Sequence, residues 1–427
     1  MRSVTIVGAS LAGLSAARAL REQSYDGPIT IIGDECRPPY DRPPLSKEFL
    51  AGTMSEAEIA LITPEDEALG LQWRLGRSAV RLDLAAGAVA LDDGERIVSD
   101  GVVIATGARA RQLPGPPLHS VHTLRTLEDA AALRRELLPG ARLVVIGAGF
   151  IGSEIASTAR SLGVQVTVVE VMATPLAGPL GTEMGAVCAA LHADHGVRLI
   201  TGAGAAELAG DYRVRAVRLA GGRELPADLV VVGIGALPCV GWLAGSGLPV
   251  NGGVLTDERC ATSAPSVVAV GDCASSRNRY AGGVLRLEHW TNAQRQPAIA
   301  AATLLGRDVA APATVMVPYF WSDQYGCRLQ FAGHRQEGDQ VDVVEGRPAE
   351  RRFVAVYRRG ESPVAVFAMN QPKEFNRWRR QLTASMTSPV GAGYRYISPY
   401  RRVSSANERQ HQPAPEPGVH AARPLLR

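Results

Sequence analysis

Two segments of the chain share one pattern, and this repetition limits the possible folds more than any other feature. In each segment an apolar run typical of a buried strand leads into a glycine-rich turn, and a helix with one apolar face follows. The turns read GASLAG at residues 8–13 and GAGFIG at residues 147–152. One such turn is a weak signal, but two of them, each between a strand and a helix, indicate a pair of dinucleotide-binding βαβ units.

An acidic residue follows the second strand of each unit. Residues 29–32 lead to Asp34 and Glu35, and residues 166–169 lead to Glu170. Backbone N–H groups at the start of each helix would hold a pyrophosphate, and the carboxylate would accept hydrogen bonds from ribose hydroxyls. Both units therefore have the parts that a dinucleotide needs.

Two single positions refine this interpretation. Ser10 takes the place of the middle glycine in the first turn, so the backbone there must tolerate a small hydroxyl near the phosphates. Glu170 would accept a hydrogen bond from a ribose 2′-hydroxyl and repel a 2′-phosphate, and residues 171–173 contain no Arg or Lys that could bind such a phosphate. The sequence thus predicts NADH rather than NADPH, with an ordinary strand end as the alternative interpretation of Glu170.

Further apolar runs end in glycine-containing turns at residues 102–107, 229–235 and 267–272. A strand end without bulky side chains lets a ligand approach the edge of a parallel sheet. We expect an α/β fold with two Rossmann-like domains, the first interrupted by the second, followed by a C-terminal α+β domain with an antiparallel sheet. The expected boundaries are 1–112 with 242–316, then 113–241, then 317–397, and a flexible tail at 398–427.

Composition and charge exclude several other classes. The 427 residues are 46% hydrophobic, and 45 Lys and Arg against 42 Asp and Glu leave a net charge of +3. Such a chain is too apolar to be disordered and too weakly charged to favour nucleic acid or a membrane surface. No run reaches the ~18 apolar residues of a membrane span. We therefore expect a soluble cytoplasmic protein.

No metal site is predicted. The six cysteines are scattered, without the close spacing of a zinc site or a disulfide framework. His192 and His195 are a weak metal signal, and we expect both at the surface.

Two segments outside the glycine-rich turns are more specific than the turns themselves. They read PYDRPPLSK at residues 39–47 and PYFWSDQY at residues 318–325. Shorter supporting segments lie at residues 104–107, 124–129, 147–154, 269–272 and 288–292. Together they resemble the FAD-dependent ferredoxin reductases that serve bacterial P450s and aromatic-ring dioxygenases, the putidaredoxin-reductase-like group. The resemblance covers residues 1 to about 385, and it implies FAD in the first unit and NADH in the second.

The resemblance also assigns residues to the two cofactors. For FAD it implies contacts from Gly8, Ser10, Leu11, Ala12, Gly13, Asp34, Glu35, Arg42, Lys47, Val80, Thr106, Gly107, Arg125, Asp272 and Trp290. For NADH it implies contacts from Gly147, Gly149, Ile151, Gly152, Glu170 and Gly235. Val80 would contact the adenosine end through its backbone, and Trp290 would pack near the isoalloxazine ring.

Lys47 and Glu154 are the catalytic residues that the resemblance implies. Lys47 would lie near the isoalloxazine, and Glu154, just inside the second helix, would pair with it close to flavin N5. A cation fixed near the flavin stabilises the charge that arrives with a hydride, and a carboxylate keeps the cation in place. A solvated surface lysine and a helix N-terminal glutamate are the alternatives.

The cysteines also bear on how electrons leave. Disulfide reductases of this architecture place a redox-active dithiol beside the flavin, and no cysteine pair here could serve. Cys273 is expected to be packed under the flavin, and Cys36 to lie at the adenosine end. Without a thiol relay, electrons must pass to an outside acceptor. The resemblance implies a small [2Fe–2S] or related ferredoxin that feeds a P450 or dioxygenase.

Other functions stay open. Rubredoxin reductase and NADH oxidase are the enzymatic alternatives, and a redox-gated signalling or binding flavoprotein is the non-enzymatic one.

A candidate docking surface lies on a helix expected at residues 372–384. Its apolar face carries Phe375, Trp378 and Leu382, and its basic face carries Lys373, Arg377 and Arg380. With Arg295, the basic face would steer an acidic ferredoxin. The alternative is a core-facing helix with a solvated basic side.

Overall fold

The computed structural model describes residues 1–310 and 314–387. The N-terminal glycine-rich turn belongs to a five-stranded parallel sheet of order β19-β7-β1-β2-β3. The strands are β1 (Val4–Val7), β2 (Ile29–Gly33), β3 (Leu71–Leu75), β7 (Gly101–Ile104) and β19 (Val267–Ala269). The central strands are rich in Val and Ile and are buried on both faces, as a covered parallel sheet requires.

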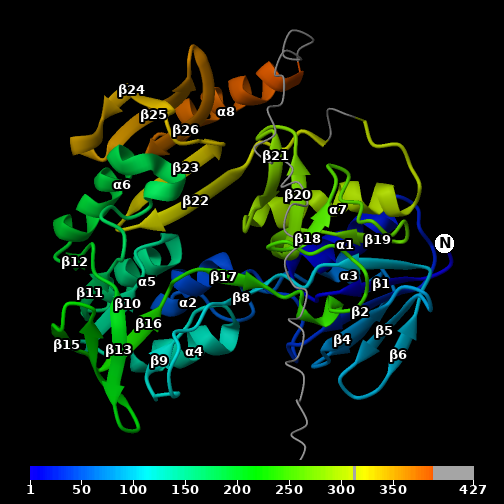
Figure 1. Ribbon diagram of the computed structural model, residues 1–427, viewed down its shortest axis with the longest axis horizontal. Helices are drawn as coiled ribbons and strands as arrows, with labels where there is room; N and C mark the ends of the chain where they lie inside the picture. Colours follow the sequence, from blue (N-terminus) through cyan, green and yellow to red (C-terminus); the bar gives the residue numbers. More distant parts are fainter. Residues whose placement is uncertain (311–313, 388–427) are drawn as a thin grey trace, which may run out of the picture. The chain divides into compact units, whose positions relative to one another are not determined.

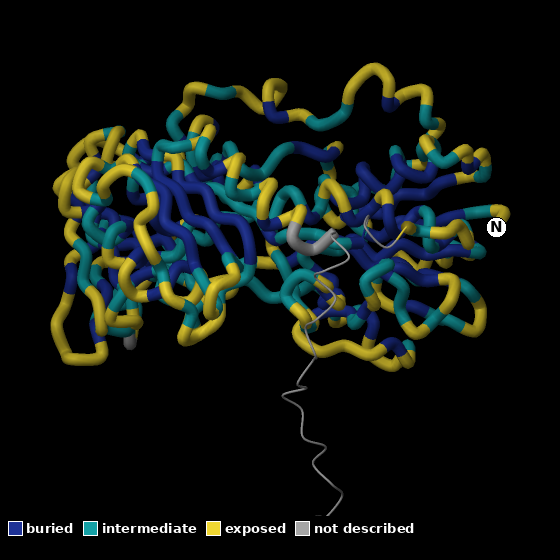
Figure 2. The backbone as a smooth tube through the Cα atoms, turned by 90° about the horizontal axis from the view of Figure 1, so that it is seen from above, coloured by how far each residue is buried: buried dark blue, intermediate teal, exposed yellow. Residues whose placement is uncertain are grey.

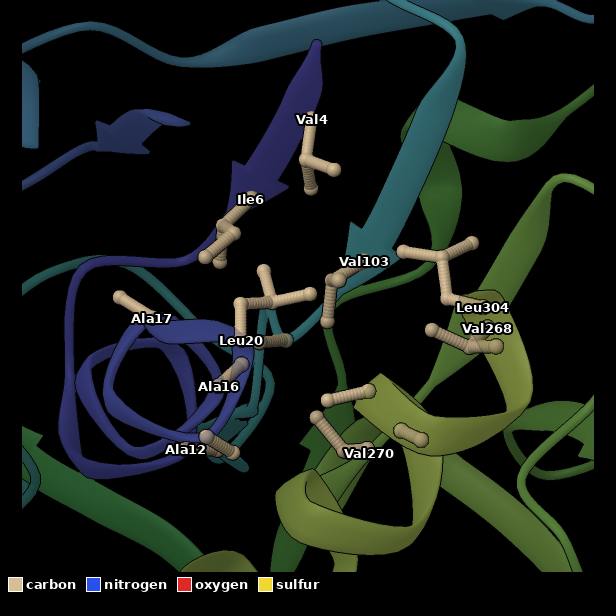
Figure 3. Close-up of a cluster of buried hydrophobic side chains, with 14 of the residues drawn as sticks. Val4, Ile6, Ala12, Ala16, Ala17, Leu20, Val103, Val268, Val270 and Leu304 are labelled. Atoms are coloured by element: carbon tan, nitrogen blue, oxygen red, sulfur yellow. The ribbon is translucent and has the colours of Figure 1, made fainter. Parts of the chain in front are cut away.

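Helices α1 (Leu11–Glu22) and α7 (Trp290–Leu304) cover one face of this sheet and contact each other. Figure 3 shows the packing of Ala12, Ala16, Ala17 and Leu20 of α1 near Val4, Ile6, Val103, Val268 and Leu304. The alanines let α1 approach the sheet closely, which places the start of the helix at the carboxyl end of β1. The opposite face packs against β4 (Ala79–Asp83), β5 (Ala88–Leu91) and β6 (Arg96–Val98).

The second glycine-rich turn belongs to another parallel sheet, of order β12-β11-β10-β16-β9. Its strands are β9 (Val121–His122), β10 (Arg142–Ile146), β11 (Gln165–Val169), β12 (Arg198–Ile200) and β16 (Leu229–Val232). Helices α4 (Leu127–Glu136) and α5 (Phe150–Ser161) pack on one face. The other face is covered by an antiparallel sheet of β13 (Ala205–Gly210), β14 (Val214–Leu219) and β15 (Glu224–Pro226).

The chain passes between the two parallel sheets twice, and the two passages pair with each other. They form an antiparallel ribbon of β8 (Ala108–Ala110) and β17 (Ala236–Pro238). The second nucleotide-binding unit is thus inserted into the chain of the first, as the sequence predicts. The two connections pair with each other as a short ribbon.

The C-terminal region is a five-stranded antiparallel sheet of order β22-β23-β26-β25-β24. Its elements are β22 (Tyr319–Gln324), β23 (Cys327–Gly333), β24 (Gln340–Arg347), β25 (Arg352–Arg359), β26 (Ser362–Met369) and α8 (Pro372–Thr387). Phe375 and Leu382 of α8 are fully buried against one face of the sheet. Figure 1 shows α6 (Ala177–Asp194) on the other side, where Leu180, Met184 and Leu191 join the core of the sheet.

The remaining elements are shorter. They are α2 (Glu48–Ala51), α3 (Pro64–Glu67), β18 (Val254–Thr256), β20 (Ala274–Asn278), β21 (Gly283–Arg286), and the 3₁₀ turns η1 (Pro43–Ser46), η2 (Gly241–Leu243), η3 (Gly271–Cys273) and η5 (Pro348–Glu350). Figure 2 shows the central strands as the most buried parts of the chain, with exposed residues mostly in the connections. Within residues 1–310 and 314–387, no helix is long and apolar enough to cross a membrane.

The predicted fold class is confirmed, including the antiparallel C-terminal sheet. One feature was not predicted, and one prediction is wrong. Helix α6 follows the second nucleotide unit in sequence but shares its core with the C-terminal sheet. His192, expected at the surface, is only 2% exposed, because the same packing covers it, whereas His195 is exposed. The tail predicted at 398–427 lies outside the described residues.

Candidate active site

The two glycine-rich turns share one backbone geometry. Gly8 and Gly147 have φ values of +122° and +101°, a region that glycine occupies readily. A Cβ on Gly152 would lie 2.1 Å from the carbonyl oxygen of Gly147, so this position also needs glycine. The middle position differs, since a Cβ on Gly149 would meet no described atom within 4 Å. The backbone there is open to a ligand, as a pyrophosphate site requires.

The first turn follows the same plan with one substitution. A Cβ on Gly13 would lie 1.8 Å from the carbonyl oxygen of Gly8, which makes Gly13 the counterpart of Gly152. Ser10 is the N-cap residue of α1, and its Oγ accepts a hydrogen bond from Arg42 Nε at 3.3 Å. Leu11 and Ala12 begin α1, where backbone N–H groups have no partner inside the helix and suit an anion.

The two carboxylates after β2 have different surroundings. Glu35 accepts hydrogen bonds from Arg42 Nη2 at 2.6 Å and from the Tyr40 hydroxyl at 2.5 Å. Asp34 is exposed. Because Asp34 is exposed whereas Glu35 is only partly exposed and paired with the Arg42 guanidinium, Asp34 is the more accessible of the two to ribose hydroxyls.

The ends of β7 and β19 meet a third segment from the loop before α4. Arg125 Nη2 donates to Asp272 Oδ2 at 2.7 Å, and a Cβ on Gly107 would lie 3.7 Å from the same guanidinium nitrogen. Thr106 Oγ1 donates to the carbonyl oxygen of Cys239 at 2.7 Å. The structure therefore brings Thr106, Gly107, Arg125 and Asp272 together at the carboxyl edge of the first sheet, where a ligand of this fold binds.

Lys47 and Glu154 form an ion pair, and their predicted position beside the flavin stays a prediction. Lys47 Nζ lies 2.9 Å from Glu154 Oε2, and the two side chains are 13% and 4% exposed. Lys47 follows η1 in the first unit, whereas Glu154 lies one turn inside α5, the helix that begins at the second glycine-rich turn. Glu154 also accepts hydrogen bonds from Ser46 and Ser322. The ion pair thus joins the two nucleotide units and the C-terminal sheet.

Trp290 begins α7 and contacts residues that sequence reasoning missed. Its indole Nε1 donates to Asp41 Oδ1 at 2.7 Å, and its ring meets Trp321 edge-on at a centroid distance of 6.0 Å. Burial raises the pKa of the Asp41 carboxyl above its usual range, although the Trp290 hydrogen bond and Lys47 act in the opposite direction. Asp41 and Trp321 lie within the two most specific sequence segments, which was the available signal.

The second nucleotide unit places its predicted residues at one strand edge. Glu170 accepts backbone hydrogen bonds at both oxygens, from Ala148 N to Oε2 and from Met172 N to Oε1, each at 2.8 Å. These amides fix the carboxylate beside the glycine-rich turn. Ile151 is 48% exposed. Gly235 has φ +96° and open space where a Cβ would stand.

Val80 lies in β4 and is 51% exposed. The pairing of β4 with β5 shifts register between Ala79 and Arg81, so Val80 has no partner residue across the ladder. A bulge of this kind leaves backbone groups available. This agrees with the expected backbone contact of Val80 with an adenosine, although the contact itself stays a prediction.

The cysteines provide no reactive thiol beside these residues. Cys273 is fully buried, its Sγ lies 3.3 Å from the carbonyl oxygen of Val270, and burial raises its pKa to about 11. Cys36 is exposed and follows Glu35. All six cysteines are free.

The expected basic helix face is present, but other cations contact the aromatic side chains of β22. Lys373, Arg377 and Arg380 are exposed on α8, and Arg377 lies 3.6 Å from Glu345 of β24, the strand farthest from β22. By contrast, the Arg379 guanidinium lies 4.0 Å from the ring centroid of Tyr319 in β22.

Two further arginines, Arg295 and Arg328, act on Arg379 or contact an aromatic ring of β22. Burial and the charge of Arg295 lower the pKa of Arg379, which shows that the two cations are close. Arg328 lies over the ring of Trp321 at 5.6 Å. Arg328 and Arg379 thus lie over aromatic rings of β22, and Arg295 of α7 acts electrostatically on Arg379; we call these three residues the arginine cluster.

Comparison with known proteins agrees with this geometry. The pyridine nucleotide-disulphide oxidoreductase family matches residues 2–297, and the reductase C-terminal family matches residues 319–391. Rhodocoxin reductase of Rhodococcus erythropolis is 38% identical over 90% of this chain and 90% of its own. The ferredoxin–NAD(+) reductase component of the biphenyl dioxygenase system of Paraburkholderia xenovorans is 41% identical over 88% of this chain and 91% of its own.

A solved structure shows the same architecture. The putidaredoxin reductase–putidaredoxin complex aligns with a TM-score of 0.85 at 35% identity, covering 90% of this chain and 93% of that one. The resemblance to the putidaredoxin-reductase-like group is thus confirmed. With matches over both of its regions, the chain belongs to the pyridine nucleotide-disulphide oxidoreductase family and carries that family's reductase C-terminal domain.

Proposed function

We propose that this chain is an NADH-dependent ferredoxin reductase, which passes electrons from NADH through FAD to a small iron–sulfur ferredoxin that feeds a P450 or ring-hydroxylating oxygenase. Relatives named as ferredoxin–NAD(+) reductase components align along nearly the whole chain, including the C-terminal domain. The observation that carries the proposal is the Lys47–Glu154 ion pair. It places a shielded cation where the two nucleotide units meet, which is where a hydride must pass from one nucleotide to the other.

The first unit fits FAD. The turn at residues 10–13, at the start of α1, would hold the pyrophosphate, Asp34 the ribose, and the Arg125–Asp272 pair the ribitol and its phosphate. FAD accepts a hydride as an electron pair and releases electrons singly. We propose that the FAD domain comprises 1–112 and 242–316, with the β8–β17 ribbon at its junctions with the NADH domain at 113–241.

The second unit fits NADH. The open backbone at Gly149 admits the pyrophosphate, and Glu170, held by two backbone amides, is oriented to accept the ribose hydroxyls. A carboxylate already fixed as an acceptor cannot move aside for a 2′-phosphate without losing these bonds, which favours NADH.

The protein's own residues then have distinct tasks. Lys47 stabilises negative charge that arrives with the hydride, and Glu154 keeps the ammonium in place. Trp290 is oriented by Asp41 and contacts Trp321 edge-on. The ring of Trp321 in turn lies under Arg328, which belongs to the cluster of Arg295, Arg328 and Arg379. That cluster would attract an acidic ferredoxin to the side of the molecule where Trp290 lies. The Cys273 thiol stays protonated at neutral pH and offers no internal disulfide relay.

Turnover with and without a ferredoxin tests the proposal. The purified, FAD-loaded protein is given NADH and cytochrome c, and cytochrome c reduction is followed with and without a small [2Fe–2S] ferredoxin. A large ferredoxin-dependent rise is expected. Equal and fast NADH loss in both samples, with oxygen consumed, would instead identify an NADH oxidase.

Rubredoxin reductase is a second candidate. The rubredoxin–NAD(+) reductase of Pseudomonas putida is 38% identical over 87% of this chain and 96% of its own. Replacing the ferredoxin with a rubredoxin in the same assay distinguishes the two, because the better acceptor will show the higher kcat/KM.

We also propose a cytoplasmic location. All six cysteines are free, which suits a reducing compartment. Cell fractionation with an antibody to the chain would test this.

A further inference from the structure

We propose that Ser322 of the C-terminal sheet is a positioning residue for hydride transfer, which acts on Lys47 through Glu154. The inference rests on the proposed function, because it assumes that Lys47 assists the hydride. It assigns to the C-terminal domain a part in the first half of the reaction, in addition to contact with an electron acceptor.

The Glu154 carboxylate is held from two sides. Its Oε2 accepts hydrogen bonds from Lys47 Nζ at 2.9 Å and from Ser46 Oγ at 2.5 Å. Its Oε1 accepts one from Ser322 Oγ at 2.7 Å, with the Asp323 backbone N–H farther away at 3.4 Å. Lys47 therefore contacts one oxygen together with Ser46, and the Ser322 hydroxyl at the other oxygen further limits the rotation of the carboxylate.

The direction of the Ser322 hydrogen bond follows from its neighbours. Gln324 Nε2 donates to Ser322 Oγ at 3.0 Å, so the single hydroxyl proton of Ser322 is left to donate to Glu154. Ser322 is 0% exposed, Gln324 1% and Glu154 3%. Water cannot readily replace a donor lost from such a site, and a buried acceptor without its partner is unfavourable.

Strand β22 contacts both the Lys47–Glu154 pair, where the hydride would pass, and the tryptophans, where electrons would leave. Successive side chains of a strand point to opposite faces. Ser322 points to Glu154 of α5, while its neighbour Trp321 meets Trp290 of α7. Strand β22 contacts both helices. The alternation places the hydrogen bond from Ser322 to Glu154 on one face of the strand and the contact of Trp321 with Trp290 on the other.

Loss of the Ser322 hydroxyl should therefore release Glu154 Oε1. The carboxylate is then free to rotate, and it holds the Lys47 ammonium in place less firmly. Since Lys47 itself remains, the protein should still bind FAD and NADH but reduce the flavin more slowly.

A double-mutant cycle tests this coupling. Wild-type protein, Ser322→Ala, Lys47→Ala and the double variant are loaded with FAD, and flavin reduction by NADH is measured anaerobically by stopped flow. We expect Ser322→Ala to lower the rate constant at saturating NADH by roughly 3- to 30-fold and to change the Kd for NADH by less than about twofold. In the Lys47→Ala background the same change should cost less than about twofold, because the residue through which Ser322 acts is gone.

Two controls accompany the cycle. Ser99→Ala also deletes a buried hydroxyl, one that donates to the carbonyl oxygen of Gly101 at 3.0 Å, and should leave the rate unchanged while lowering thermal stability to a similar extent. If Ser322→Ala does not fold, Ser322→Cys, whose thiol is a much weaker donor than the hydroxyl, replaces it in the cycle, and a smaller loss is then expected, still confined to the background that contains Lys47.

The outcomes separate this inference from the proposed function. An unchanged rate in Lys47→Ala would overturn the role of Lys47, and with it that of Ser322. A slow Lys47→Ala with a wild-type rate in the Ser322 variant, or an equal loss from the Ser322 change in both backgrounds, would overturn the role of Ser322 alone. A loss confined to the background that contains Lys47 would support it.

Discussion

Lys47 shows how a single residue obtains its chemical role from its surroundings. A mostly buried ammonium is unfavourable unless it is paired, and here Glu154 supplies the counter-charge at 2.9 Å. Glu154 is in turn held by two serines from different parts of the chain. The cation is thus shielded from water and fixed before any ligand binds, which is the condition under which a charge contributes most to a transition state.

Replacing Lys47 by Ala should slow flavin reduction by NADH by about 100-fold, because a fixed charge at the reacting centre contributes on this scale. FAD content should remain near wild type, since other residues hold the cofactor. Stopped-flow reduction and the absorbance of bound flavin measure the two effects. Arg215→Ala, which breaks an exposed ion pair with Asp211, is the control and should leave the rate unchanged. Loss of FAD with a normal rate in the remaining holoenzyme would contradict the assignment.

His192 is a second residue whose environment decides its chemistry. It is buried beside Tyr325, whose hydroxyl lies 2.8 Å from His192 Nδ1, and burial lowers its pKa to about 4. The folded protein therefore resists protonation of this ring, while the unfolded chain accepts a proton near pH 6.5. The stability that neutral His192 provides is complete above about pH 6.5 and is lost as the pH falls toward 4.

The free energy of unfolding should accordingly fall as the pH is lowered from about 6.5 to 4, with His192 contributing up to about 3 kcal/mol of that loss. His192→Gln keeps a neutral hydrogen-bonding side chain and should flatten this part of the profile. Urea unfolding at several pH values measures it. A profile for the variant as steep as that of the wild type would exclude His192 as a source.

At the scale of elements, the three glycines of the second glycine-rich turn, Gly147, Gly149 and Gly152, have different tasks. The outer ones allow the helix to pack on its strand, since a Cβ at Gly152 would collide with the turn. The middle one leaves room that no described atom fills. Packing and ligand binding are therefore separable within six residues.

This separation can be measured with two alanine variants. Gly149 has φ −70°, which any residue adopts, so Gly149→Ala should keep its thermal midpoint and raise the Kd for NADH by roughly tenfold or more, because the Cβ occupies the path of the pyrophosphate. Gly152→Ala should instead destabilise the second unit, since its Cβ would lie 2.1 Å from a carbonyl oxygen. Thermal unfolding and NADH titration separate the effects. Equal loss of stability in both variants would refute the division.

The same elements show what sequence could and could not predict. The strand–turn–helix units were predictable because their hydrophobic period and glycine spacing are local. Asp41 and Ser322 were not singled out, because their roles depend on partners far away in the chain, at Trp290 and Glu154. His192 was misplaced for the same reason, since the sheet that covers it begins more than one hundred residues later.

At the scale of the whole molecule, the sites that we propose for hydride entry and electron exit lie on different elements, which meet at β22. Helix α6 shares a core with the C-terminal sheet, so the second nucleotide unit and that sheet are joined by buried apolar contacts. The cations over Tyr319 and Trp321 come from α8 and β23, and Arg295 of α7 acts electrostatically on the one from α8. A partner that docks there would contact elements from separate parts of the chain.

Charge reversal tests where the partner docks. Arg295→Glu should raise the apparent KM for an acidic ferredoxin several-fold at low salt, and the effect should fade as salt increases, because screening weakens long-range attraction. Arg377→Glu should have a smaller effect, since Arg377 lies near Glu345 at the far edge of the sheet. Flavin reduction by NADH should be normal in both. A larger effect at Arg377 would move the docking surface to the outer face of α8.

The most direct test of the whole account is an anaerobic electron count. FAD-loaded protein in catalytic amount is mixed with a limiting quantity of NADH and an excess of a [2Fe–2S] ferredoxin. The oxidation of NADH and the reduction of the ferredoxin are followed by absorbance. A hydride carries two electrons and each ferredoxin accepts one, so two ferredoxins should be reduced for every NADH oxidised. Oxidation of NADH without reduction of the ferredoxin would contradict the account.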